Sequence, residues 1–205
     1  MPPLSFPIIL ASASPRRQEI LRNAAISFEV VPTNVDETPR PDEPAEQLCR
    51  RLAREKAEAA VRMISANPAL AGRPVLAADT IVVLPAGSAS ENILGKPADP
   101  ADAKRMLQML AGRTHRVMTG VCLSAASSSG RRFQIEVETT NVVMNAITAA
   151  ELDDYVASGE PLDKAGAYAI QGRASRWIPR IEGCYFNVVG LPITRVFELL
   201  KRLEI

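Results

Sequence analysis

Hydrophobic and polar positions along this chain follow two different spacings. Short, nearly continuous apolar runs bounded by Pro, Gly, Ser or Asn are typical of buried strands, whereas apolar residues repeating every three or four positions indicate amphipathic helices. The predicted strands cover residues 8–11, 28–31, 74–84, 116–124, 133–143, 177–181 and 186–189. The predicted helices begin after Ser14 and cover residues 44–64, 100–111, 149–158 and 192–203.

The helix predicted over residues 44–64 separates an apolar stripe from a charged face. The stripe contains Ala45, Leu48, Cys49, Leu52, Ala59 and Met63. Lys56 falls near the middle of this stripe, while four charged residues lie opposite it: Arg50, Arg54, Glu58 and Arg62. A lysine there either reaches past its neighbours to water or lines a cleft and points its ammonium at an anion. The clean segregation of the remaining charges favours the second interpretation.

Polar residues gather where the first strand meets the first helix. Ser14 occupies an N-cap position, and Pro15 occupies the first helical position, where a missing N–H breaks no hydrogen bond. Arg16 and Arg17 follow in the first turn, although the positive end of the helix dipole disfavours cations there. Together with Ser12, these groups form either a solvated surface turn or a phosphate site built from N–H groups, hydroxyls and guanidinium groups.

Acidic residues and one further lysine stand out later in the chain. Asp79 is the single charge inside its apolar strand, and a buried carboxylate needs a hydrogen bond, a cation or a reacting group. We favour a chemical role because the chain has a separate candidate anion site. Asp36 and Glu37, in a Pro-rich loop, are either solvated or oxygen ligands for a hard cation. Lys96 is either a solvated loop lysine or a second phosphate ligand.

The composition of the chain argues against several classes of protein and of site. The chain has 205 residues with 24 Lys and Arg against 23 Asp and Glu, so it has no global positive field for nucleic acid. Its three cysteines are isolated, which argues against a disulfide scaffold. The single histidine, His115, argues against a zinc site or a His-based triad, and a structural or surface role is expected. Without a recognisable signal peptide or membrane-spanning run, we expect a cytoplasmic protein with no membrane partner.

Several segments, taken in order, resemble the Maf-type nucleoside triphosphate pyrophosphatases. They are Leu10-Ala11-Ser12-Ala13-Ser14-Pro15-Arg16-Arg17, Val35-Asp36-Glu37, Arg54-Glu55-Lys56-Ala57, Ala78-Asp79-Thr80, Gly95-Lys96-Pro97, Asp163-Lys164-Ala165-Gly166-Ala167-Tyr168 and Val189-Gly190-Leu191-Pro192. The resemblance implies an α/β, ITPase-like fold with an elongated mixed sheet flanked by helices. It also implies a single domain over residues 1–205, with two lobes and a central nucleotide cleft, and a homodimer.

The resemblance also implies an active site and a reaction. The family's polar positions match Ser12, Arg17, Glu37, Lys56, Asp79 and Lys96, with Asp79 as the proton acceptor. Ser12, Ser14 and Arg17 would then cradle the triphosphate, while Lys56 and Lys96 neutralise charge on the leaving pyrophosphate. Glu37 and Asp79 would hold a divalent cation, Mg²⁺ or Mn²⁺. We expect neither Arg17 nor Lys56 to take part in a core ion pair.

Specificity residues separate subgroups within the family. Arg16, Thr80 and Gln171 resemble the set of the dTTP/UTP-hydrolysing subgroup, which predicts dTTP, UTP and modified pyrimidines such as 5-methyl-UTP as substrates. A neutral Gln171 amide offers both a donor and an acceptor to a pyrimidine edge. The alternatives are a 7-methyl-GTP pyrophosphatase of the same family and a non-catalytic nucleotide-binding regulator of septum formation. The family name is linked to septum formation and cell-division arrest, and the resemblance implies a role in nucleotide-pool sanitation.

Overall fold

The computed structural model describes residues 7–85, 91–128 and 130–203, and the chain divides into two compact units. The first unit comprises Met1–Asp79, Thr119–Glu138 and Gly190–Ile205, and the second comprises Thr80–Met118 and Thr139–Val189. The small residues over positions 85–92 predict a loop, most of which lies outside the described residues. The prediction that both units form one domain around a nucleotide cleft stays a prediction.

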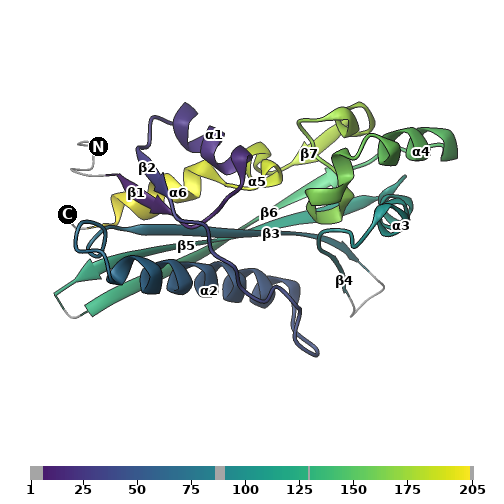
Figure 1. The fold of residues 1–205 in the computed structure, drawn as a ribbon. Coiled ribbons are helices and arrows are strands. Elements are labelled where there is room, and N and C mark those ends of the chain that lie inside the picture. The colour runs from purple at the N-terminus through teal and green to yellow at the C-terminus, as the bar shows by residue number, and fades with distance from the viewer. Residues whose placement is uncertain (1–6, 86–90, 129, 204–205) are drawn as a thin grey trace. The chain divides into compact units, whose positions relative to one another are not determined.

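A mixed, seven-stranded sheet is the framework of the protein (Figure 1). Its strand order is β2-β1-β3-β5-β6-β7, with β4 paired to β3. Strand β1 runs parallel to β2 and β3, whereas β4 is antiparallel to β3 and β7 is antiparallel to β6. The strands are β1 (Ile8–Leu10), β2 (Phe28–Val30), β3 (Val75–Pro85), β4 (Glu91–Leu94), β5 (Thr114–Ser127), β6 (Gly130–Val143) and β7 (Arg180–Glu182). The predicted α/β fold, a mixed sheet flanked by helices, is confirmed.

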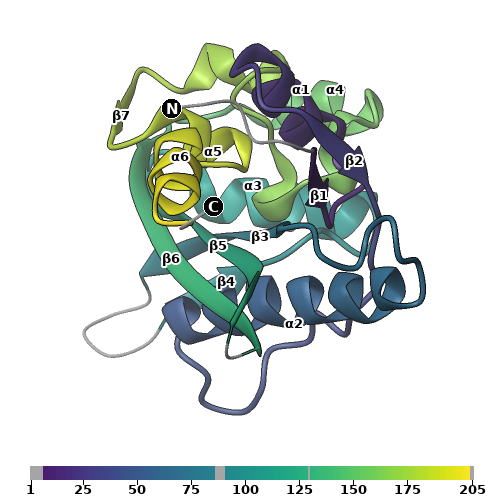
Figure 2. The same cartoon turned by 90° about the vertical axis from the view of Figure 1, so that its left-hand side faces the viewer.

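In the first unit, helices cover both faces of the strands (Figures 1 and 2). Helix α2 (Ala45–Ser65) lies on one face, and α1 (Pro15–Asn23) and α6 (Ile193–Lys201) lie on the other. The α2 backbone comes very close to the sheet, because a Cβ added to Gly120 would lie 2.3 Å from the Cys49 carbonyl oxygen. This close packing suits the small side chains on the buried face of α2, such as Ala53, Ala57 and Ala60.

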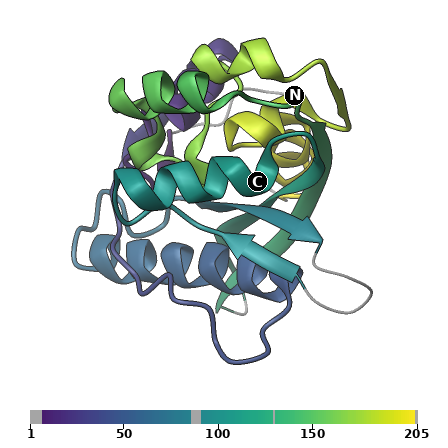
Figure 3. The same cartoon turned by 90° about the vertical axis from the view of Figure 1, so that its right-hand side faces the viewer.

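In the second unit, α3 (Pro100–Leu110) lies between the strands and α4 (Ala149–Ala157), as Figure 3 shows. Three short 3₁₀ segments follow: η1 (Glu160–Asp163), η2 (Ala165–Ala167) and η3 (Arg173–Trp177). Gly166 has φ of +66°, and a Cβ on it would lie 2.7 Å from Val82. The small residues of this segment therefore allow a close backbone approach, and what the backbone approaches is a strand.

Local capping signals predict helix starts well, whereas the last predicted strand is wrong. Ser14 caps its helix as expected, and Asp99 and Thr148, which precede helices in the same way, cap theirs, the last through a complete capping box. Residues 186–189, however, belong to helix α5 (Tyr185–Val189). There the buried Asn187 side chain donates to the Val117 carbonyl and Thr140 Oγ1, and these tertiary contacts override the strand preference of the neighbouring residues.

Two smaller corrections concern element boundaries and faces. The strand predicted over residues 177–181 begins only at Arg180, because Trp177 ends the 3₁₀ segment η3. Met63, placed on the apolar stripe of α2, is 56% exposed, and Ile64 is buried instead. Among the described residues, no helix combines the length and apolarity that crossing a membrane requires.

Candidate active site

Two serine hydroxyls shape the junction between β1 and α1. Ser14 caps the helix, because its Oγ accepts from the Arg17 backbone N–H at 3.5 Å, and Pro15 opens the first turn. Ser12 is buried, and its Oγ accepts from the Ser14 N–H at 3.2 Å. The hydroxyls therefore lie at the positive end of the α1 dipole, where anions bind favourably.

The Arg17 side chain is fixed beside these serines. Its Nη1 donates to Ser12 Oγ at 3.1 Å, and its Nε donates to the Gly190 carbonyl oxygen at 2.9 Å. Burial lowers the pKa of the Arg17 guanidinium from its ordinary value, while attraction from Asp79 and Glu37 acts against that shift. Because arginine remains protonated at physiological pH, Arg17 supplies a fixed positive charge that these two carboxylates sense.

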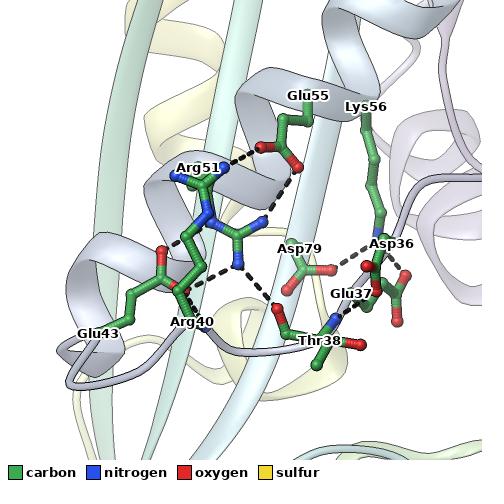
Figure 4. Close-up of polar contacts among 9 residues, drawn as sticks. All are labelled: Asp36, Glu37, Thr38, Arg40, Glu43, Arg51, Glu55, Lys56 and Asp79. Carbon is green, nitrogen blue, oxygen red and sulfur yellow. Dashed lines mark hydrogen bonds and ion pairs between the residues drawn. The ribbon is translucent and has the colours of Figure 1, made fainter.

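Lys56 joins two carboxylates from different parts of the first unit (Figure 4). Its Nζ donates to Asp79 Oδ1 at 2.5 Å and to Glu37 Oε1 at 2.6 Å. The Lys56 and Asp79 side chains are only 11% and 8% exposed, whereas Glu37 is 45% exposed. The cluster is therefore buried on the Asp79 side and open to water on the Glu37 side.

Helix α2 and strand β3 place Lys56 and Asp79 opposite each other. Lys56 lies on the buried face of α2 between Leu52, Ala53, Ala57 and Ala60, so its aliphatic stem packs among apolar side chains. The expectation that Lys56 takes no part in a core ion pair is wrong. The helical pattern shows that Lys56 faces inward, but it contains no information about which strand residue meets it.

The chemistry of Glu37 and Asp79 suits a hard divalent cation. Both supply carboxylate oxygens, and one oxygen of each contacts the same Lys56 nitrogen, so the two groups converge on one small volume. Within residues 7–85, 91–128 and 130–203, no group of three or more His, Cys, Asp or Glu side chains is arranged to hold a metal. The residues present therefore fit the mode in which one or two carboxylates act together with substrate phosphates.

A model of the Maf-like protein family matches residues 7–203. This chain belongs to the Maf-like family. It is 48% identical over 199 residues to the dTTP/UTP pyrophosphatase of Koribacter versatilis, covering 97% of this chain and 95% of that protein. It is 45% identical to the protein of the same name from Anaeromyxobacter sp., covering 97% of this chain and 90% of that protein. It is also 45% identical to the protein of that name from Salmonella typhimurium, covering 95% of this chain and 91% of that protein.

Four further residues predicted to bind substrate or to select the base lie in different elements of the two units. Arg16 is half-buried in the first turn of α1, in the first unit. Lys96 is exposed in the segment between β4 and α3, Thr80 is half-buried in β3, and Gln171 is exposed between η2 and η3. These three belong to the second unit, and their roles stay predictions.

Two features of this Maf protein were missed by sequence reasoning. Gly190 presents its carbonyl to Arg17 with φ of +120°, a conformation that favours glycine. Arg51 forms a nearly buried ion pair with Glu43, although the helical pattern places Arg51 outside the apolar stripe. The glycine before Leu191-Pro192 was a usable signal for the first feature. Nothing in the spacing of Glu43 and Arg51 predicts the second.

Proposed function

We propose that this Maf protein hydrolyses dTTP and UTP to the nucleoside monophosphate and pyrophosphate, and that it accepts modified pyrimidine nucleotides such as 5-methyl-UTP. The observation that carries the proposal is the buried Lys56, which bridges Asp79 and Glu37 within the electrostatic range of Arg17. Relatives that share nearly half of their residues with this chain bear the name dTTP/UTP pyrophosphatase. Cations and carboxylates together suit phosphoryl chemistry, because the substrate is anionic and the attacking water must lose a proton.

The triphosphate binds, in this proposal, at the N-terminus of α1. Ser12 and Ser14 supply hydroxyls, the first helical turn supplies N–H groups, and Arg17 supplies a charged guanidinium already held by Ser12 and Gly190. Because these donors are fixed before substrate arrives, little reorganisation is needed when charge develops. Lys56 and Lys96 are the cations proposed to stabilise charge on the leaving pyrophosphate.

Asp79 is the proposed general base. Lys56 holds its Oδ1, which orients the carboxylate and leaves Oδ2 as the oxygen proposed to take the proton from water. The water oxygen then bonds to the α-phosphorus while the bond from that phosphorus to the bridging oxygen breaks. The bridging oxygen departs with pyrophosphate.

A divalent cation is proposed to act with these residues. Glu37 and Asp79 would hold Mg²⁺ or Mn²⁺ through carboxylate oxygens, together with phosphate oxygens of the substrate. When bound, such an ion offsets phosphate charge and lowers the pKa of a coordinated water. The homodimer and the cytoplasmic location expected from the sequence also stay predictions.

A substrate panel tests the proposed function. The purified protein is assayed with the common nucleoside triphosphates, 5-methyl-UTP and 7-methyl-GTP, with Mg²⁺, with Mn²⁺ and with a chelator, and pyrophosphate is measured. We expect the largest kcat/KM for dTTP and UTP, and no turnover with the chelator. A preference for 7-methyl-GTP would contradict the pyrimidine assignment but keep the pyrophosphatase reaction. Nucleotide binding without turnover would support the regulator instead.

A combined variant tests the specificity residues. Arg16→Trp, Thr80→Gln and Gln171→Glu together introduce the residues of the 7-methyl-GTP subgroup. We expect kcat/KM to shift toward the methylated purine, because a carboxylate and an indole attract a cationic base. An unchanged ratio of kcat/KM for UTP and 7-methyl-GTP would show that other residues select the base.

A further inference from the structure

The position of Glu37 depends on a long segment without regular structure. Residues 31–44 join β2 to α2, and this β2–α2 loop carries Glu37 near its middle. One local contact stabilises the loop there, because Asp36 Oδ1 accepts from the Thr38 N–H at 2.9 Å. Such a turn sets the backbone direction around Glu37, but it does not attach the loop to the helix that carries Lys56.

Arg51 makes the buried part of that attachment, beside an exposed pair between Arg40 of the loop and Glu55 of the helix (Figure 4). Its Nε donates to Glu43 Oε1 at 2.7 Å and its Nη2 to Glu43 Oε2 at 2.8 Å, which is a two-point contact with the end of the loop. The same Nη2 donates to the Thr38 carbonyl oxygen at 3.1 Å, one residue after Glu37. Nη1 donates to Glu55 Oε2 at 3.1 Å, which fixes the guanidinium against its own helix.

Burial distinguishes this contact from the exposed ion pairs between residues of α2. The Arg51 and Glu43 side chains are only 13% and 8% exposed, whereas the Arg54–Glu58 pair is 55% and 34% exposed. Arg51 holds the pKa of Glu43 at about 2, well below its ordinary value, chiefly through their hydrogen bond. Glu43 is therefore ionised throughout the neutral range, and the pair persists wherever the enzyme is assayed.

Arg51 and Lys56 lie five residues apart on the same helix, and each binds a different part of the same loop. We infer that Arg51, through Glu43 and the Thr38 carbonyl, is a positioning residue that holds Glu37 against Lys56 and beside Asp79. The inference rests on the proposed function, in which Glu37 and Asp79 act together at the reacting phosphate. Displacing a group at such a site by about 1 Å is enough to lower turnover strongly.

Three variants separate positioning from general stabilisation. Arg51→Ala removes the contacts to the loop, and Arg51→Lys keeps the charge but loses the planar fork that contacts both Glu43 oxygens. Arg54→Ala is the matched control, because Arg54 pairs with Glu58 along the same helix and its Glu58 contact does not involve the loop. Hydrogen exchange of the β2–α2 loop and steady-state turnover of dTTP are measured for all three.

The expected results differ between the variants. For Arg51→Ala, loop amides that are protected in the unmodified protein should exchange at least about tenfold faster, and kcat should fall about tenfold. Arg51→Lys should show smaller changes of the same kind, and it serves in place of Arg51→Ala if that variant does not fold. Arg54→Ala should leave both measurements unchanged.

A double-mutant cycle decides whether Arg51 acts through Glu37. In a Glu37→Gln background, Arg51→Ala should change kcat by less than about twofold, because the carboxylate it positions is already gone. Equal losses in both backgrounds, or unchanged exchange of the loop, would overturn the inference. If the unmodified protein shows no turnover, the proposed function fails, and the exchange measurement alone still decides whether Arg51 fixes the loop.

Discussion

Both units of this Maf protein contain buried polar side chains that contact each other, and the Lys56–Asp79–Glu37 cluster of the first unit differs in charge from the His115–Tyr168 cluster of the second. In the first unit, the Lys56 ammonium touches the carboxylates of Asp79 and Glu37. In the second, His115 Nε2 lies 2.7 Å from the hydroxyl of Tyr168, and burial lowers the pKa of His115 to about 4. The first cluster therefore combines two carboxylates with one ammonium group, whereas the second is an imidazole–phenol pair that is neutral at pH 7.

The difference in charge and exposure between the clusters indicates a different role for each. Charged groups are expensive to bury, and the first cluster has two carboxylates for one ammonium, with the Arg17 guanidinium in electrostatic range and one side open to water through Glu37. Such an arrangement can bind a cation or take up a proton. His115 is 1% exposed, and its Nδ1 has no hydrogen-bond partner among the described residues. A neutral, buried pair of this kind contributes to packing, so the surface role considered for His115 is wrong.

The largest effect is expected from removing the cation of the first cluster. Lys56→Met keeps the length of the side chain but leaves the buried Asp79 carboxylate without its ammonium. We expect the free energy of unfolding to fall by about 3 kcal/mol, since breaking a buried pair leaves one charge uncompensated. The double variant Lys56→Met, Asp79→Asn should recover most of that loss. Denaturant unfolding measures both, and a single variant as stable as the unmodified protein would contradict the buried-pair interpretation.

Removing the carboxylate should affect turnover more than stability. Asp79→Asn keeps the shape of the side chain but removes the proposed base and one oxygen ligand, so kcat for dTTP should fall at least about 100-fold. Lys56 keeps Glu37 as a partner, so the loss of stability should be smaller than for Lys56→Met. Steady-state kinetics and denaturant unfolding test this, and near-normal turnover in the folded variant would rule out the role of Asp79.

The sequence predicts the members of the first cluster but not their contacts. An inward-facing Lys56 and an isolated Asp79 are visible from helical spacing and from the surrounding apolar run. Their pairing is set by which strand α2 covers, and strand order is a tertiary property. The same reason explains the missed Arg51–Glu43 contact. The helix starts were predictable because their capping signals lie within a few residues of one another.

Because of His115 in the second cluster, we expect the free energy of unfolding to depend on pH. His115 has a pKa of about 4 in the folded protein against 6.5 in the unfolded chain, so the unfolded chain binds the proton first as pH falls. Stability should therefore decrease between about pH 6.5 and pH 4, by about 2 kcal/mol between pH 7 and pH 5. In His115→Gln this decrease should be absent. Denaturant unfolding at both pH values is the measurement.

The smallest effect is expected at the hydroxyl of Tyr168. Its ring packs edge-on against His115 with centroids 5.4 Å apart, so Tyr168→Phe keeps the ring contact and removes only the hydrogen bond to Nε2. The loss of stability should be about 1 kcal/mol, as for a typical buried hydrogen bond. Because Tyr168 is outside the proposed site, kcat for dTTP should not change. A large fall in kcat with little loss of stability would show that the neutral cluster also takes part in catalysis, and the contrast between the two units would no longer hold.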